Sequence, residues 1–114
     1  MFTIVLLDKK TDKLLKKVYA KDNDYLSKEE KEDSLNYPNL SEISECDITV
    51  FGANDAEALA YELEKLQISL PDEQKKHVGE IVKLANICRD NSEYVLGFTP
   101  FASFLSSQEL EEIL

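Results

Sequence analysis

The side chains that most often perform catalysis are scarce in this chain of 114 residues. It contains one histidine, His77, and two cysteines, Cys46 and Cys88. A thiol nucleophile needs a base within hydrogen-bonding reach, but His77 and Cys88 stand three turns apart on one predicted helix, about 16 Å in rise. No serine sits in the glycine pattern of a nucleophile elbow. We therefore expect no catalytic residue and no enzymatic activity, with His77 as an exposed side chain on its helix.

Metal and cofactor sites have no clearer signature. Zinc sites bring cysteine and histidine together, and here these residues occur singly. The run Asp22–Asp24 begins like a calcium loop, but the glycine required at the sixth position is missing. Phosphate-binding loops need closely spaced glycines, and the three glycines stand alone. The sequence predicts neither a metal nor a cofactor.

Acidic residues and tyrosines gather in one polar segment near the middle of the chain. Carboxylates form charge-assisted hydrogen bonds with lysine and arginine of a partner, and tyrosine is enriched at interfaces. The alternative is a solvated loop whose tyrosines pack into the core. The residues that we expect to bind a partner are Asp22, Asp24, Tyr25, Glu29, Glu30, Glu32, Asp33, Tyr37, Glu42, Glu45 and Asp47.

The formal net charge of −10 restricts the class of partner. Phosphates of nucleic acids and anionic membrane surfaces attract basic proteins, so both are disfavoured. A strong negative field speeds the encounter with a basic protein. Residues 22–47 hold nine acids against two lysines, whereas residues 1–21 hold six lysines against two aspartates. If those lysines compensated the acids within the chain, the case for a basic partner would weaken.

The chain length indicates the number of domains, and the N-terminal residues and cysteines indicate the cellular compartment. A chain of this length forms one domain, residues 1–114, with a core that needs no disulfide. Two free thiols fit a reducing compartment. The apolar run after Met1 is of strand length, is too short for a membrane span and lacks the flanks of a signal peptide. We expect a cytoplasmic protein, and the sequence leaves its oligomeric state open.

Periodicity predicts four strands and two main helices. Leu14–Ala20 could also form a short helix; as a strand, its Lys16 and Lys17 would mark an exposed edge. The fold class is α+β, a small antiparallel or mixed sheet of about four strands with two helices packed on one face. The predicted strands are Phe2–Leu7, Leu14–Ala20, Asp47–Phe51 and Glu93–Thr99.

The helices are predicted from apolar residues at helical spacing. The first is capped by Asn54 and leaves its glutamates Glu57, Glu62 and Glu64 outside the buried face. The second begins after Pro71 and runs to about Asp90. Capping-box spacing adds short helices at Ser27–Leu35 and from Ser106. Core positions predicted from this spacing, and from the strand and tail that follow, are Ala56, Leu59, Ala60, Leu63, Leu66, Val78, Ile81, Leu84, Ala85, Cys88, Phe98, Phe101 and Phe104, the last two alternatively an exposed anchor.

Several segments between Tyr37 and Phe98 resemble a family of small acidic bacterial proteins. They are Tyr-Pro-Asn-Leu-Ser (37–41), Asp-Ile-Thr-Val-Phe (47–51), Glu-Leu-Glu-Lys-Leu (62–66), Leu-Ala-Asn-Ile-Cys (84–88) and Tyr-Val-Leu-Gly-Phe (94–98). That family includes the immunity proteins of contact-dependent growth inhibition (CDI) toxin–immunity systems. The resemblance implies a protein that neutralises the toxic domain of a partner surface protein, often a nuclease. It assigns no binding residue, because such residues vary with the toxin.

Charge and resemblance agree on one hypothesis. Nucleases that bind phosphates are basic, so their inhibitor benefits from an acidic surface that covers the active-site cleft. We expect an immunity protein for a cognate basic toxin nuclease, an RNase rather than a DNase. The alternative is an acidic adaptor or nucleic-acid mimic that binds another basic protein.

Overall fold

The computed structural model describes residues 2–19, 23–27, 36–44 and 46–100. Two short 3-10 helices, η1 and η2, precede the third strand. In chain order the elements are β1 (Thr3–Asp8), β2 (Leu14–Tyr19), η1 (Asp24–Leu26), η2 (Leu40–Glu42), β3 (Thr49–Gly52), α2 (Ala53–Gln67), α3 (Asp72–Asp90) and β4 (Tyr94–Thr99).

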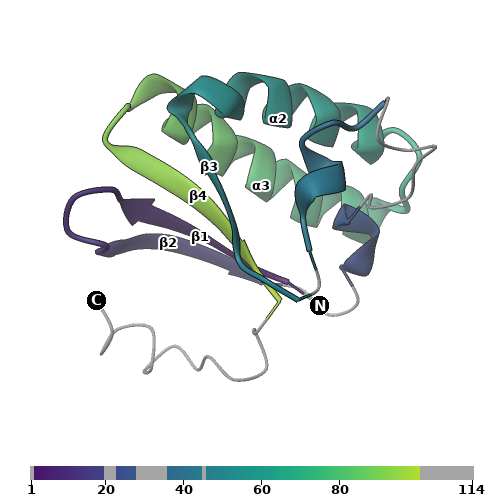
Figure 1. The fold of residues 1–114 in the computed structure, drawn as a ribbon. Helices are drawn as coiled ribbons and strands as arrows, with labels where there is room; N and C mark the ends of the chain where they lie inside the picture. Colours follow the sequence, from purple (N-terminus) through teal and green to yellow (C-terminus); the bar gives the residue numbers. More distant parts are fainter. Residues whose placement is uncertain (1, 20–22, 28–35, 45, 101–114) are drawn as a thin grey trace.

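The four strands form one antiparallel sheet in the order β2-β1-β4-β3. Both long helices lie on the same face of this sheet, as Figure 1 shows. The expected α+β fold is confirmed, and the strand order that the sequence left open is settled. Leu14–Tyr19 is a strand at one edge, so the edge position expected from Lys16 and Lys17 is confirmed as well. The other edge is β3.

Side-chain alternation gives the sheet its two faces. Ile4 pairs with Phe98 and Leu6 with Leu96, and all four side chains are buried beneath the helices. Phe51 of β3 joins them, with its ring edge-on to Phe98 at 5.6 Å between centroids. Val5 pairs with Gly97 on the opposite face. Because β1 is apolar on both faces, its sequence shows a continuous hydrophobic run instead of strict alternation.

The helices bury the predicted stripes. All of the core positions predicted in α2 and α3 are inaccessible or nearly so, Cys88 among them. The predicted cap is wrong: Asn54 lies inside the first turn of α2, and Gly52 precedes the helix in an extended conformation. Because β3 runs into α2 without an intervening loop, Gly52 itself occupies the N-cap position, and a glycine has no side chain to cap the helix. Neither α2 nor α3, the long helices of the described chain, could cross a membrane.

Two expected short helices concern parts of the chain that the structure does not describe. Ser27 ends η1 with extended dihedral angles, and residues 28–35, where the predicted helix would continue, lie outside the described residues. The helix expected from Ser106, together with Phe101 and Phe104, lies outside them too.

Candidate protein-binding surface

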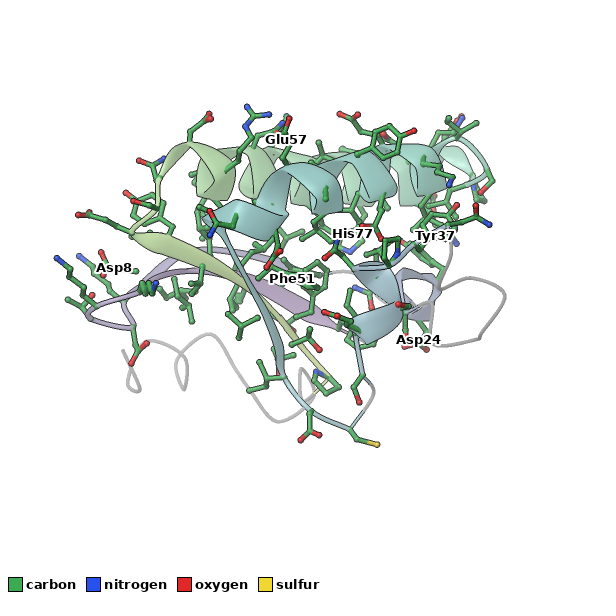
Figure 2. All side chains as sticks on the ribbon, turned by 45° about the horizontal axis from the view of Figure 1, so that its top comes forward. Asp8, Asp24, Tyr37, Phe51, Glu57 and His77 are labelled. Atoms are coloured by element: carbon green, nitrogen blue, oxygen red, sulfur yellow. The ribbon has the colours of Figure 1, made fainter. Side chains whose placement is uncertain are left out.

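Five of the eleven residues expected to bind a partner are described. Asp24, Glu42 and Asp47 are exposed, and Tyr25 and Tyr37 are half-buried. Asp24 and Tyr37 lie toward the end of the molecule opposite to Asp8 and the lysine-bearing β1–β2 turn (Figure 2). The remaining six lie outside the described residues: Asp22, Glu29, Glu30, Glu32, Asp33 and Glu45.

The two tyrosines contribute to packing as well as to the surface. Both rings pack against the core, and burial raises the pKa of the Tyr25 phenol above its ordinary value. The ammonium group of Lys65 lies 5.0 Å from the centroid of the Tyr37 ring, within the range of a cation–π contact. Each ring therefore helps to hold the acidic segment on the fold and still presents part of its edge.

A buried carboxylate fixes the position of η2. Glu62 of α2 is only 3% exposed, and its Oε1 accepts the backbone N–H groups of Asn39 at 2.8 Å and Leu40 at 3.1 Å. Its Oε2 accepts the Asn39 side-chain amide. These charge-assisted bonds satisfy the buried charge and the N–H groups of the turn together. The expectation that Glu62 belongs to the solvent face is wrong, because the turn that it binds needs an internal acceptor.

A buried amide fixes the segment that leads into η1. Asn23 is fully buried; its Oδ1 accepts the Phe2 N–H at 2.6 Å, and its Nδ2 donates to the Phe2 carbonyl at 2.8 Å. Nδ2 also lies 3.1 Å from Nε2 of His77, which must therefore accept and leave the imidazole proton on Nδ1. His77 is 6% exposed, so the expectation of a surface histidine is wrong. Burial lowers the pKa of His77, opposed by the nearby Glu80 carboxylate.

The spacing of His77 and Glu62 in the sequence indicates that both side chains are buried, contrary to the expectation that they are exposed. His77 is spaced four, seven and eleven residues before Ile81, Leu84 and Cys88, so it continues the apolar stripe of α3. Glu62 is three residues after Leu59 and four before Leu66, on the buried face of α2. Helical spacing predicts burial for both side chains, whereas their polarity suggests the surface.

The loop before β3 is held by two long local hydrogen bonds and leaves apolar groups exposed. The Thr49 hydroxyl donates to the Glu42 carbonyl at 3.3 Å and accepts the Ser44 N–H at 3.4 Å. Beyond it, Ile48 and Val50 are each 54% exposed. With the exposed Asp47 they form what we call the β3 patch. Because Phe51 points into the core, strand alternation places Val50 on the opposite face of the sheet. Val50 is not among the residues expected from the sequence to bind a partner.

The strand order separates the acids near β3 from the lysines of β2. Register places Lys17, Val5, Gly97 and Val50 in one row across the sheet. Three strand spacings amount to about 14 Å, which exceeds the screening length of about 8 Å in physiological salt. Lys16 and Lys17 instead border a hollow of about 350 Å³ between β2 and α3, with Lys83 on its other side. The lysines of β2 therefore do not compensate the acids at the β3 edge.

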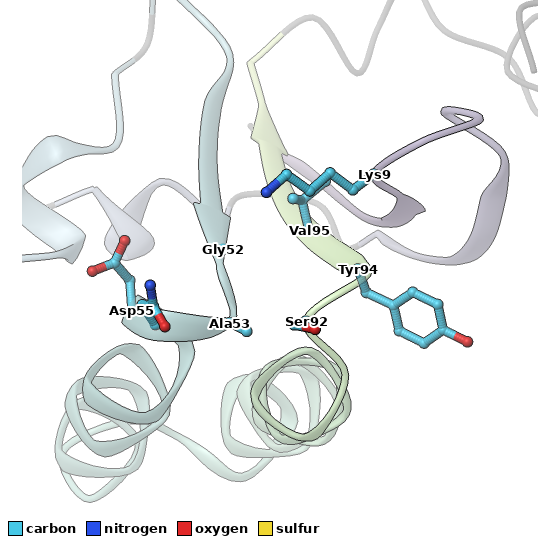
Figure 3. A pocket seen from close by; sticks show the side chains of 8 residues that line it. Lys9, Gly52, Ala53, Asp55, Ser92, Tyr94 and Val95 are labelled. Atoms are coloured by element: carbon cyan, nitrogen blue, oxygen red, sulfur yellow. The ribbon is translucent and has the colours of Figure 1, made fainter.

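A smaller hollow lies at the start of α2 (Figure 3). It measures about 200 Å³, and its lining includes Lys9, Asn54, Asp55, Ser92 and Tyr94. This is smaller than the clefts that enclose drug-sized ligands. Within the described part of the chain, no three histidine, cysteine, aspartate or glutamate residues are placed to hold a metal ion.

Comparison with protein-family models, with curated proteins and with solved structures finds no match to this chain.

Proposed function

We propose that the chain is a cytoplasmic immunity protein that binds a basic toxin nuclease and neutralises it. The observation that carries the proposal is an acidic surface near β3 that the lysines of β2 lie too far away to compensate. No lysine or arginine occurs from residue 32 to residue 64, a stretch that holds nine acids. The exposed Glu42 and Asp47 belong to it, and the sheet separates them from the lysines of β2. Such a surface attracts a basic protein and repels nucleic acid.

Inhibition on this proposal is steric and electrostatic. Exposed carboxylates meet lysine and arginine side chains that otherwise hold the phosphates of the substrate. The anchored segments η1 and η2 present their acids on a rigid support, which limits the entropy lost on binding. The inhibitor needs no catalytic group, since occupation of the cleft is enough.

The resemblance to CDI immunity proteins favours a nuclease among the basic proteins that such a surface would attract. An acidic adaptor or nucleic-acid mimic bound to another basic protein is the second candidate, because its surface would carry the same charge. The two differ in one measurable property, which is the nuclease activity of the partner.

The proposal is tested by affinity capture from the source cells with the neighbouring open reading frames expressed. The captured protein is identified by mass, purified and assayed on RNA and on DNA. We expect a basic domain that cleaves RNA and loses its activity at one equivalent of this chain. A basic partner without nuclease activity would establish the adaptor instead. If only acidic proteins or none were captured, the proposed function would be refuted.

A matched pair of variants tests the acidic surface itself. Glu42→Gln with Asp47→Asn removes two exposed acids near β3, and Glu57→Gln with Glu64→Gln removes two exposed acids of α2. Both double variants have the same net charge, so a difference between them reports position. We expect the first pair to weaken inhibition by about tenfold and the second by about twofold or less.

A further inference from the structure

In the described part of the chain, the large apolar side chains that are exposed lie on β2, on or beside α2, and on or beside β3. Leu15 is on β2, Tyr61 and Ile68 are on or beside α2, and Ile48 and Val50 belong to the β3 patch. Single exposed apolar residues are common and need no explanation. Ile48 and Val50 are instead two residues apart, and each exposes half of its surface to water.

The β3 patch lies on a firm support. Val50 pairs with Gly97, and Gly97 pairs with Val5. A Cβ atom on Gly97 would lie 3.2 Å from Cγ2 of Val5, so the Val5 side chain extends over the glycine. No side chain of β4 therefore separates Val50 from Val5, which is itself buried. An apolar surface fixed by strand pairing loses little entropy when a partner covers it.

The charged residues nearby distinguish the β3 patch from the other exposed apolar residues. Leu15 lies next to Lys16 on the basic edge strand. Tyr61 lies on α2 and Ile68 directly after it, close in sequence to Lys65 of that helix. The β3 patch contains Asp47 and follows Glu42, within the stretch that holds no base. It therefore combines an apolar surface with a negative charge that lies at the opposite edge of the sheet from the lysines of β2.

We propose that Ile48 and Val50 form the apolar anchor of an interface with a basic protein, and that Asp47 and Glu42 guide that protein to it. The inference rests on the proposed function and states which surface performs it. The occupant is a surface with an apolar side chain set among lysines or arginines. A second copy of this chain does not fit, because it would bring together two like-charged surfaces on molecules of net charge −10.

The two kinds of residue have separable kinetic roles. Charges at the rim of an interface act mainly on the association rate and its salt dependence. Buried apolar anchors act mainly on the dissociation rate. We expect Ile48→Ser or Val50→Ser to speed dissociation by about tenfold and to leave association nearly unchanged. Leu15→Ser, which removes an exposed apolar side chain of the opposite edge strand, is the matched control and is expected to change neither rate.

Photo-crosslinking in the source cells tests the surface while the partner is still unidentified. The photo-reactive amino acid p-benzoylphenylalanine replaces Val50 in one full-length chain, Leu15 in a second and Tyr61 in a third. We expect the chain altered at position 50 to form a covalent adduct with one basic protein, and the other two to form none. The adduct partner is then purified and used to measure the rates of the serine variants.

Each outcome bears on the anchor or on the proposed function. A basic adduct partner at position 50 whose dissociation quickens in Ile48→Ser or Val50→Ser supports both. Adducts with a basic nuclease only from position 15 or 61 would overturn the anchor and leave the proposed function standing. An adduct at position 50 with an acidic protein would refute the basic partner class and with it the proposed function. If no position formed an adduct and capture also failed, both inferences would be overturned.

Discussion

Asn23 and His77, which are 54 positions apart in the chain, form a buried pair in which Nδ2 of the amide lies 3.1 Å from Nε2 of the imidazole. The same amide holds both backbone groups of Phe2. Rotating the amide by half a turn would break both of those bonds, so its orientation is fixed. His77 must accept a hydrogen bond, and a protonated imidazole has no atom that can accept one.

This relationship predicts that folding stability depends on the charge of His77. Burial lowers the pKa of His77 in the folded state below its ordinary value of 6.5, so the unfolded chain binds the proton more readily. The contribution to the free energy of unfolding is complete above pH 6.5 and is lost as the pH falls through the lower folded-state pKa. Urea denaturation at about pH 8, 6.5 and 5 measures it.

The control for this pH dependence is His77→Gln, which has an amide oxygen to accept from Asn23 and does not titrate. The difference in stability between the original chain and this variant is expected to shrink or change sign on acidification. A difference that stays constant across the pH series would show that His77 protonation is not linked to folding.

The carboxylate of Glu62 predicts a large loss of stability when it is removed. Glu62→Ala would leave three buried or half-buried N–H groups of Asn39 and Leu40 without their acceptor. We expect a fall in the free energy of unfolding of about 3 kcal/mol. Glu62→Gln keeps one oxygen for the two backbone donors, and the Asn39 amide can turn its own oxygen toward the new NH₂ group, so we expect about 1 kcal/mol.

Denaturant unfolding of these two variants is compared with Glu64→Ala, an exposed change on the same helix that should stay within about 0.5 kcal/mol. If Glu62→Ala were as mild as Glu64→Ala, the carboxylate would contribute nothing to holding η2.

The close approach of Val5 to Gly97 predicts coupling between the two positions. In Gly97→Ala the new methyl group would lie 3.2 Å from Cγ2 of Val5, which is tighter than ordinary contact. Overpacking of this kind is expected to lower stability by about 1 kcal/mol. In the background of Val5→Ala the same change should cost less, because the space is free. A double-mutant cycle by thermal denaturation measures the coupling, and strict additivity would argue against the contact.

The two thiols are predicted to differ in reactivity. Cys88 is buried, and burial raises the pKa of its thiol. Its single S–H lies within reach of the Tyr94 carbonyl, at 3.5 Å from Sγ, and of the Phe51 carbonyl, at 3.8 Å. Cys46 is exposed beside the β3 patch. Since the thiolate is the reactive form, iodoacetamide should label Cys46 in the native protein and both thiols only after denaturation. Equal labelling of both in the native protein would contradict the burial of Cys88.

Sequence periodicity predicts the helices and strands well because the spacing of apolar residues largely determines which segments form them. The stripe of α2 and the alternation around Phe51 follow directly from spacing, and the strand order does not, since pairing partners depend on contacts distant in sequence. The sequence predicts the wrong exposure for polar residues that form hydrogen bonds with groups distant in the chain. Glu62 is internal because the Asn39 turn must be satisfied, and His77 because Asn23 supplies its partner. Neither partner can be found from local sequence.

For the proposed binding surface, the acidic composition predicts a basic partner, and the fold indicates which residues would contact it. The acidic excess of residues 22–47 is visible in the sequence, but its compensation by lysines depends on where β2 lies. The exposure of Val50 depends on which face Phe51 occupies, so a residue typical of a core strand becomes a candidate anchor.

Recognition of a basic nuclease by an acidic surface makes the association rate of the captured nuclease depend on salt, and stopped-flow mixing at increasing salt measures that dependence. Between about 50 mM and about 500 mM NaCl we expect the association rate constant to fall by about tenfold or more. Reversal of Glu29, Glu30, Glu32 and Asp33 to lysine should slow association further at low salt. An association rate that is independent of salt and unchanged by the reversal would show that the acidic surface does not guide the nuclease.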